Sequence, residues 1–232
     1  MAWKRVDQIL DALFPSRCLL CGQPAGPAGP ACAGCLADLP WLEASLPPLA
    51  GFAEVRSALS YEYPVDRLIG AAKFGRQVPV ARGLGQLLAR RMPGLPVAPD
   101  AVVPVPLHWR READRGFNQA EEVARSLCQE RGWPLRANLC RRVRQTPEQS
   151  ALGAALRREN LRGAFALADG RTAARCRHVL LVDDVLTTGA TAEAVASVFL
   201  AAGVPRLSLW TVAHTPSPAT GARPGQATER KV

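Results

Sequence analysis

The segment from Val179 to Thr191, with the sequence VLLVDDVLTTGAT, constrains the fold of this 232-residue chain more than any other part of it. It begins with an apolar run, Val179 to Val182, which predicts a buried strand. Two adjacent acids follow, then a turn with threonines and a glycine, and then an alanine-rich helix from about Thr191. Such a strand–loop–helix unit gathers free backbone N–H groups and the positive end of a helix dipole, which favours a bound phosphate. The candidate binding residues of this unit are Asp183, Asp184, Thr187, Thr188, Gly189, Ala190 and Thr191.

The two acids indicate what else the ligand carries. Carboxylates beside a phosphate site would repel a ligand that consists of phosphate alone. They fit a ligand with neighbouring hydroxyl groups next to its phosphate, because carboxylates accept hydrogen bonds from hydroxyls or hold Mg²⁺. Gly189 would let the backbone approach such a ligand closely. The alternative is a strand that ends in two aspartates before an ordinary capped helix.

The same segment resembles the PRPP loop of type I phosphoribosyltransferases, and the match is complete from Val179 to Thr191. The resemblance implies that Asp183 and Asp184 hold the ribose hydroxyls of phosphoribosyl pyrophosphate (PRPP). It implies that the turn holds the 5′-phosphate and that Mg²⁺ accompanies PRPP. The implied reaction is transfer of the phosphoribosyl group to a nucleophile, with pyrophosphate as the leaving group.

The rest of the chain alternates between strand-like and helix-like patterns. Strands are predicted at 55–63, 101–105, 135–140, 165–167, 179–182 and 207–212, and helices at 65–74, 79–92 and 118–131. This alternation predicts an α/β fold with a mostly parallel, doubly wound sheet. We expect a cysteine-bearing module at 1–50, a phosphoribosyltransferase-like domain at 51–215, and a disordered tail at 216–232.

The N-terminal segment carries two CxxC pairs, Cys18 with Cys21 and Cys32 with Cys35, separated by ten residues. This spacing is typical of a tetrahedral structural zinc site. The loop between the pairs is too short and too poor in apolar residues to form a core. A metal would supply folding free energy on the order of 10 kcal/mol. Two redox pairs, disulfides or an iron–sulfur cluster are the alternatives, and disulfides are disfavoured in the cytoplasm.

The net charge is +9, with 26 arginines and three lysines. It indicates affinity for a polyphosphate, for nucleic acid or for both, unless it is only an ordinary basic surface. Apolar residues at helical spacing in 1–14 predict a short amphipathic helix, and the charges within it argue against a signal peptide. No apolar run approaches the roughly 20 residues that span a bilayer, so we expect a cytoplasmic protein without a membrane span.

A second group of candidate residues follows the strand predicted at 101–105. In type I phosphoribosyltransferases the loop at this place binds pyrophosphate, and the planar forks of Arg110 and Arg111 suit a diphosphate. His108 is better interpreted as a packing histidine than as a catalytic base. The resemblance implies that the segment from 144 to 160 is a flexible loop that closes over the pyrophosphate, with a solvated helix as the alternative. The residues singled out in it are Arg144, Thr146 and Gln149.

Together with Lys73-Phe-Gly75 and Arg115-Gly-Phe-Asn-Gln119, these features resemble the ComF family of competence-related phosphoribosyltransferase homologues. The resemblance runs from about Cys18 to His214 and implies a link to natural transformation, with single-stranded DNA and DNA-uptake proteins as partners. A non-catalytic factor that handles single-stranded DNA and a PRPP sensor are the alternatives to an enzyme. The acceptor nucleophile, the catalytic residue and a homodimer stay open. The last predicted strand leads directly into the tail, so only the cysteine module and residues 52–75 are left to cover the site.

Overall fold

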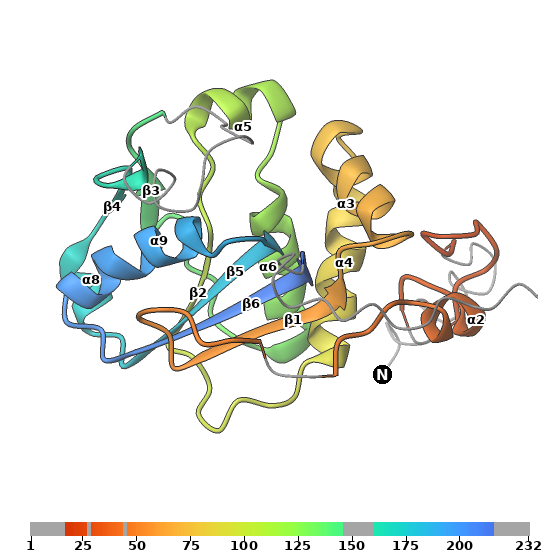
Figure 1. The fold of residues 1–232 in the computed structure, drawn as a ribbon, viewed down its shortest axis with the longest axis horizontal. Coiled ribbons are helices and arrows are strands. Elements are labelled where there is room, and N and C mark those ends of the chain that lie inside the picture. Colours follow the sequence, from red (N-terminus) through yellow and green to blue (C-terminus); the bar gives the residue numbers. More distant parts are fainter. Residues whose placement is uncertain (1–16, 27–28, 44–45, 146–159, 216–232) are drawn as a thin grey trace, which may run out of the picture.

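The computed structural model describes residues 17–26, 29–43, 46–145 and 160–215. Within them, four parallel strands form the central sheet in the order β1-β6-β5-β2 (Figure 1). The strands are β1 (Glu54–Ser60), β2 (Ala101–Pro104), β5 (His178–Leu186) and β6 (Arg206–His214). β5 and β6 occupy the centre of the sheet, which is why they are buried along most of their length. The strand that leads into the Thr-Thr-Gly turn is therefore supported on both edges.

Helices cover both faces of this sheet. They are α3 (Val65–Phe74), α4 (Val78–Arg91), α6 (Gln119–Arg131) and α9 (Ala190–Ala201). Alternate strand residues point to opposite faces. Leu180 and Trp210 lie in one apolar cluster with residues of α3, α4 and α6. Leu181 and Leu209 lie in a second cluster with residues of α9. The predicted α/β fold with a parallel, doubly wound sheet is confirmed (Figure 1).

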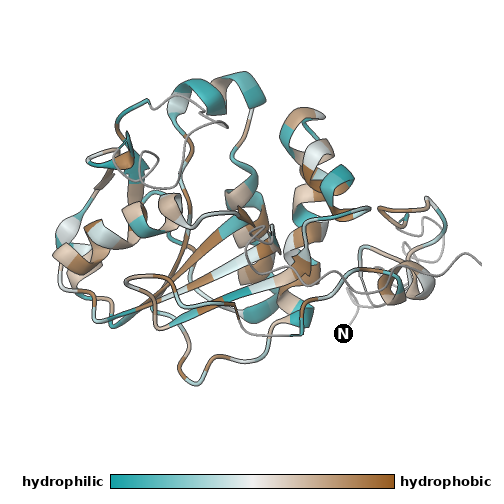
Figure 2. Cartoon of the chain, in the orientation of Figure 1, coloured by the Kyte–Doolittle hydropathy of each residue, from teal (hydrophilic) through white to brown (hydrophobic). Residues whose placement is uncertain are grey.

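The basic segment 107–117, interpreted as a loop, contains the short helix α5 (Trp109–Arg115). It begins after His108 and ends at Gly116, which adopts a left-handed conformation with φ of 87°. None of its residues is buried, so it lacks the apolar periodicity by which a helix is found in a sequence. Figure 2 shows mainly hydrophilic residues on α5, which stands away from the sheet.

The strand predicted at 135–140 is also different in the structure. Leu135 makes only an isolated bridge to Val102 of β2. The extended segment is β3 (Cys140–Arg142), which pairs antiparallel with β4 (Phe165–Leu167) outside the central sheet. Turn residues separate the two parts, so one predicted strand is a bridge followed by a short strand. A further short helix, α8 (Gly170–Ala174), is capped by the Asp169 carboxylate.

The cysteine module contains α2 (Ala33–Ala37) and lies at one end of the molecule, beside α3 and α4 (Figure 1). It packs against α4 at Gly83, where a side-chain Cβ would overlap with Leu19 and Pro30 of the module. The following segment then crosses to the other face of the sheet, where Leu49 and Phe52 pack against the cluster that contains α9. The chain before β1 thus contacts both helical layers.

Among the described residues, no helix is long and apolar enough to cross a membrane. The helix predicted at 1–14 and the tail at 216–232 lie outside the described residues. The boundaries at residues 50 and 215 remain predictions.

Candidate functional site

The two acids lie within β5 rather than after its end. The strand continues to Leu186, with Val185 and Leu186 opposite Ala213 and His214 of β6. Backbone N–H groups of the strand orient both carboxylates. Asp183 Oδ1 accepts a hydrogen bond from the N–H of Asp184 at 2.8 Å. Asp184 Oδ1 accepts one from the next N–H along the chain at 2.7 Å. The acids are thus held by a buried central strand rather than by a free loop.

The turn after β5 leads into a helix whose N-terminus has no side-chain cap. Gly189 is the N-cap residue of α9 and adopts φ of 78°, a conformation that favours glycine. A Cβ at this position would also overlap with the side chain of Leu49. Glycine is therefore required for the backbone turn and for the close packing of Leu49, which belongs to the segment before β1. The first N–H groups of α9 are left for another acceptor.

A cavity of about 590 Å³ opens at the carboxyl ends of the strands. This volume lies in the range of small-molecule sites, roughly 300–1,000 Å³. The structure brings most of the predicted binding residues together around it. Those that line the cavity are Asp183, Asp184, Thr187, Thr188, Ala190, Thr191 and Arg111. Residues 52–75 contribute Tyr61 and Lys73, whereas none of the described residues of the cysteine module belongs to the lining.

The other predicted residues lie differently. Arg110 is outside the cavity lining: its guanidinium stacks on Trp109 at 5.2 Å and donates to Gln145 Oε1 at 3.0 Å. Arg144 donates from Nη2 to the carbonyl oxygens of Asn160 and Arg162, at 2.7 and 2.6 Å. Thr146 and Gln149 lie outside the described residues.

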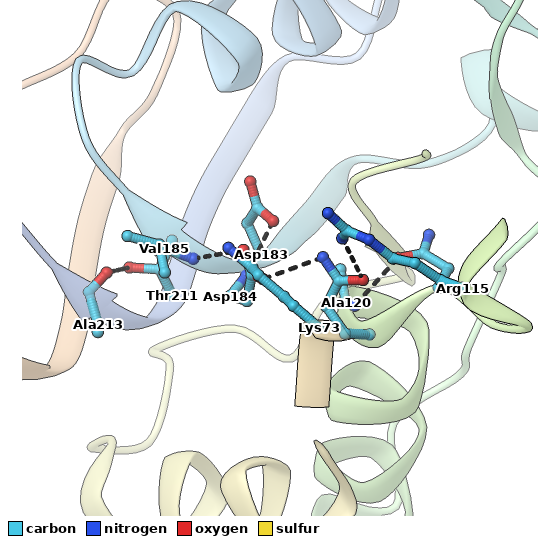
Figure 3. Close-up of polar contacts among 10 residues, drawn as sticks. Lys73, Arg115, Ala120, Asp183, Asp184, Val185, Thr211 and Ala213 are labelled. Atoms are coloured by element: carbon cyan, nitrogen blue, oxygen red, sulfur yellow. Dashed lines mark hydrogen bonds and ion pairs between the residues drawn. The ribbon is translucent and has the colours of Figure 1, made fainter. Parts of the chain in front are cut away.

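A cluster of polar side chains around Asp184 was missed by sequence reasoning. Lys73 Nζ lies 2.9 Å from Asp184 Oδ2. Gln119 Nε2 donates to the same oxygen at 3.0 Å, and Arg115 Nη1 donates to Gln119 Oε1 at 3.0 Å (Figure 3). The Lys73-Phe-Gly75 and Arg115–Gln119 segments contribute to the family resemblance, but the resemblance assigns no role to their side chains. Asn118 caps α6, because its side-chain oxygen accepts a hydrogen bond from the N–H of Ala120.

Three arginines, Arg111, Arg115 and Arg142, line the same cavity as the acids, and only the first was predicted. Arg142 comes from β3, whose position beside His108 is fixed by an isolated bridge between the two residues. Planar guanidinium groups on α5 and β3 are suited to the two oxygens of a phosphate. The cavity therefore contains both acidic and basic side chains.

The acid pair carries less negative charge than its sequence indicates. Burial raises the pKa of Asp183 well above its usual value, and the negative charge of Asp184 raises it further. The ammonium of Lys73 acts in the opposite direction but does not reverse the shift. Because one acid resists ionisation and the other is paired with Lys73, the acid pair repels an anionic ligand less than two free carboxylates would.

His108 has a structural role in this arrangement. It is buried, and its Nδ1 accepts a hydrogen bond from the N–H of Arg110 at 3.4 Å, at the start of α5. Burial lowers the pKa of His108, and the positive charges of Arg142, Arg110 and Arg111 lower it further. A neutral imidazole that caps a helix agrees with its interpretation as a packing histidine.

The four cysteines form a metal-binding group at the other end of the molecule. The Sγ atoms of Cys18, Cys21, Cys32 and Cys35 all lie within 4.8 Å of one another. A tetrahedral zinc ion, with Zn–S bonds of about 2.3 Å, separates its sulfurs by about 3.8 Å. The Sγ atoms of Cys21 and Cys32 are 3.7 Å apart. The group therefore fits Zn²⁺ without rearrangement of the backbone.

The ionisation of these thiols also fits a metal site. Burial opposes the Cys18 thiolate, but the backbone N–H groups of Cys21, Cys32 and Leu20 outweigh it and lower the pKa of Cys18 to about 6. The neighbouring thiols of Cys21 and Cys32 raise the pKa of Cys35. One thiolate thus makes the next harder to form. A divalent cation would supply the positive charge that lets four thiolates coexist.

The chain is similar to several known proteins. Residues 9–52 match the double zinc ribbon domain. The chain is 34% identical over 206 residues to the DNA utilization protein YhgH of Salmonella typhi, covering 86% of this chain and 85% of the relative. It is 36% identical over 160 residues to Competence protein F of Haemophilus influenzae, covering 66% and 69%. It is similar to the glutamine PRPP amidotransferase from B. subtilis with a TM-score of 0.39 and 18% identity, over 56% of this chain and 25% of that one.

The four-cysteine group is therefore a structural zinc site, as predicted. A parallel α/β sheet with the acid–threonine–glycine turn on a central strand, preceded by a zinc ribbon, defines a zinc-bearing α/β protein. Its similarity to the two named relatives shows that the chain belongs to the ComF family.

Proposed function

We propose that the cavity binds PRPP and that the protein transfers its phosphoribosyl group to a nucleophile, with release of pyrophosphate. One observation carries this proposal: a single cavity combines an uncapped helix N-terminus, two aspartates and three arginines. PRPP has a matching set of groups, since it carries a phosphate, a diol and a diphosphate on one ribose. The aspartates and the helix N-terminus come from one continuous segment, and the arginines come from α5 and β3, which are distant from it in the sequence.

Each part of the ligand has a proposed place. The 5′-phosphate would accept hydrogen bonds from the first N–H groups of α9 and from the hydroxyls of Thr187, Thr188 and Thr191. The ribose hydroxyls would donate to Asp183 and Asp184. Thr188 and Asp183 are only partly buried, so both remain accessible to a ligand in the cavity.

The diphosphate would lie against Arg111 and Arg142, which line the cavity from α5 and β3. Carboxylate and phosphate oxygens are the ligands that Mg²⁺ prefers, so the acid pair and the bound diphosphate together fit this ion. When bound, Mg²⁺ would offset the negative charge that develops on the leaving group. The arginine forks would hold the same oxygens and orient the bond that breaks.

The proposed reaction is a substitution at C1 of the ribose. The bond from C1 to the pyrophosphate oxygen breaks, and its electron pair leaves with pyrophosphate. The nucleophile forms the new bond to C1 and loses a proton. No residue is assigned as the base that takes this proton, and the nucleophile is unidentified.

Calorimetric titration of the zinc-loaded protein with PRPP and Mg²⁺ tests the binding step. In a separate thermal unfolding experiment, PRPP at about 100 times its dissociation constant should stabilise the fold by roughly 2.7 kcal/mol and so raise the Tm. Arg111→Gln and Asp183→Ala should weaken binding. Arg141→Gln is the matched control, because Arg141 is exposed and lies outside the cavity lining. Absence of binding to the natural sequence would refute the proposal.

The transfer step needs a separate experiment. Amines and nucleobases are incubated with PRPP, Mg²⁺ and protein, and pyrophosphate release is measured. Release that depends on one acceptor and is lost in Asp183→Ala would support an enzyme. PRPP binding without release for any acceptor would favour a PRPP sensor instead.

A second candidate function is binding of single-stranded DNA, together with DNA-uptake proteins. Two observations favour it: the net charge of +9 and the names of the two relatives, which refer to DNA utilization and competence. Binding through phosphates should weaken with salt, with log K falling by about 0.7 per neutralised phosphate for each tenfold rise in salt. Fluorescence anisotropy with a single-stranded oligonucleotide measures this slope, and salt-independent binding would contradict the electrostatic account.

A further inference from the structure

The side chains around Asp184 form a network of contacts that the proposed binding of PRPP does not explain. Lys73 on α3 and Gln119 on α6 both contact Asp184 on β5. Arg115 bonds to Gln119 and also stacks on the ring of Phe74 at 5.5 Å, next to Lys73 in the chain. Figure 3 shows Lys73 and Arg115 approaching the acids from separate elements.

This network holds Asp184 in place even without the lysine. Asp184 Oδ2 accepts from Gln119, and Oδ1 accepts from the N–H of Val185. The Gln119 amide is itself oriented, because its oxygen accepts from Arg115 and its nitrogen must then face the acid. If Lys73 moved away, the Asp184 carboxylate would still have two hydrogen-bond donors.

Lys73, in contrast, is free to move. The Lys73 side chain is 22% exposed at the cavity wall, against 9% for Asp184. Its ammonium is carried on a flexible stem of four carbons, unlike the planar guanidinium groups of the arginines that line the cavity. The C-terminal end of α3 is fixed separately, since Arg76 donates to the carbonyl oxygen of Asp114 at 2.6 Å. Movement of the Lys73 ammonium therefore requires no movement of the helix.

We propose that Lys73 is a displaceable counter-ion of Asp184, which keeps divalent cations away from the acid until PRPP arrives. Two cations close to one carboxylate oxygen repel each other, so a metal ion alone competes with the tethered ammonium. The Mg²⁺ complex of PRPP brings its own oxygens, to which the ammonium can transfer. Lys73 is thus a positioning residue that makes the cavity select metal-bound PRPP over free metal. This inference rests on the proposed function.

Mn²⁺ titration followed by electron paramagnetic resonance tests this selection without PRPP and without turnover. In the zinc-loaded protein, Lys73→Gln should bind Mn²⁺ at least about tenfold more tightly than the natural sequence, since it removes one like charge near the acid. Lys73→Arg should retain weak binding. The double variant Lys73→Gln with Asp184→Asn should lose the gain. Equal Mn²⁺ affinity of Lys73→Gln and the natural sequence would overturn the proposal.

A measurement on the unaltered chain covers the case in which a variant does not fold. The chain has only three lysines, so NMR of ¹⁵N-labelled lysine side chains can resolve the Lys73 ammonium. Its signal should shift when PRPP and Mg²⁺ are added together and stay unchanged with Mg²⁺ alone. An unchanged signal in a protein that calorimetry shows to be saturated with PRPP would refute the displacement. Failure of PRPP to bind at all would refute the proposed function, while the Mn²⁺ contrast tests the counter-ion separately.

Discussion

The zinc module and the α/β domain are held together in different ways. In the domain, two apolar clusters on opposite faces of the sheet contain every residue from Val179 to Val182 of the central strand. In the module, α2 has no buried residue, and the four cysteine sulfurs form its organised centre. Its apolar side chains, such as Leu19 and Leu36, pack against the core of the domain. A small module can thus take its order from a metal and its position from a neighbour.

Removal of the metal should give the largest effect, and only on the module. Cys35→Ser should lose the zinc, about one ion per chain, and with it folding free energy on the order of 10 kcal/mol for the module. Metal analysis and hydrogen exchange of residues 17–43 measure the two losses. Cys128→Ala, a buried cysteine of the domain, is the control and should retain zinc. If Cys35→Ser unfolded the whole chain, the two regions would not be separate in stability.

A cavity in the domain core should give the reverse result. Leu180 is fully buried in the central strand, so Leu180→Ala should lower the free energy of unfolding by about 2–5 kcal/mol. Zinc content should not change, because the cysteine ligands lie outside this cluster. Urea unfolding measures the loss, with the exposed Leu200→Ala on α9 as a control that should change stability little. Loss of zinc in Leu180→Ala would show that the module depends on the domain for its metal.

Acid should weaken the domain through His178. Burial lowers the pKa of this histidine, and its neutral ring bonds to the carbonyl of Val97 and to Ser208 Oγ. The unfolded chain binds a proton near pH 6.5, whereas the folded chain resists it, so stability is full above that pH and falls as the pH drops below it. One histidine contributes a slope of at most about 1.4 kcal/mol per pH unit. Urea unfolding of the natural sequence and His178→Gln between pH 7 and 5 should give the shallower slope for the variant, and equal slopes would contradict this origin.

The contact between the two regions should give the smallest effect. Gly83→Ala places a Cβ against Leu19 and Pro30 and should cost about 1 kcal/mol, because the module must shift. Gly70→Ala on α3 is the matched control: a Cβ there meets open space, and alanine should stabilise the helix by about 0.5–1 kcal/mol. Thermal unfolding compares the two variants. Equal and stabilising effects would show that the module does not rest on α4 at this point.

Local features of both regions were predictable from the sequence. The strand before Asp183, the turn at Gly189 and the helix from Ala190 follow one another within a few residues, so apolar runs and turn residues identify them. The CxxC spacing likewise predicts the zinc ligands, because both pairs lie in one short segment.

Contacts between distant segments were not predictable. The pairing of Lys73 with Asp184 depends on how α3 is placed against β5, and no pattern in either segment encodes it. The difference between Arg110 and Arg111 has a similar origin. Neighbouring residues on a helix point about 100° apart. Since the segment was interpreted as a loop, nothing in the sequence could show that only Arg111 faces the cavity.

The strand order has a consequence for synthesis of the chain. β1 is the first strand to be made, but its only strand partner in the described sheet is β6, the last one. Until His214 has left the ribosome, the edges of β1 and β5 that β6 will join stay unpaired, and unpaired edges invite association with other chains. Pairing across so long a separation also forms slowly. The zinc ribbon, whose ligands are close in sequence, can form before β6 has been synthesised and the central sheet is complete.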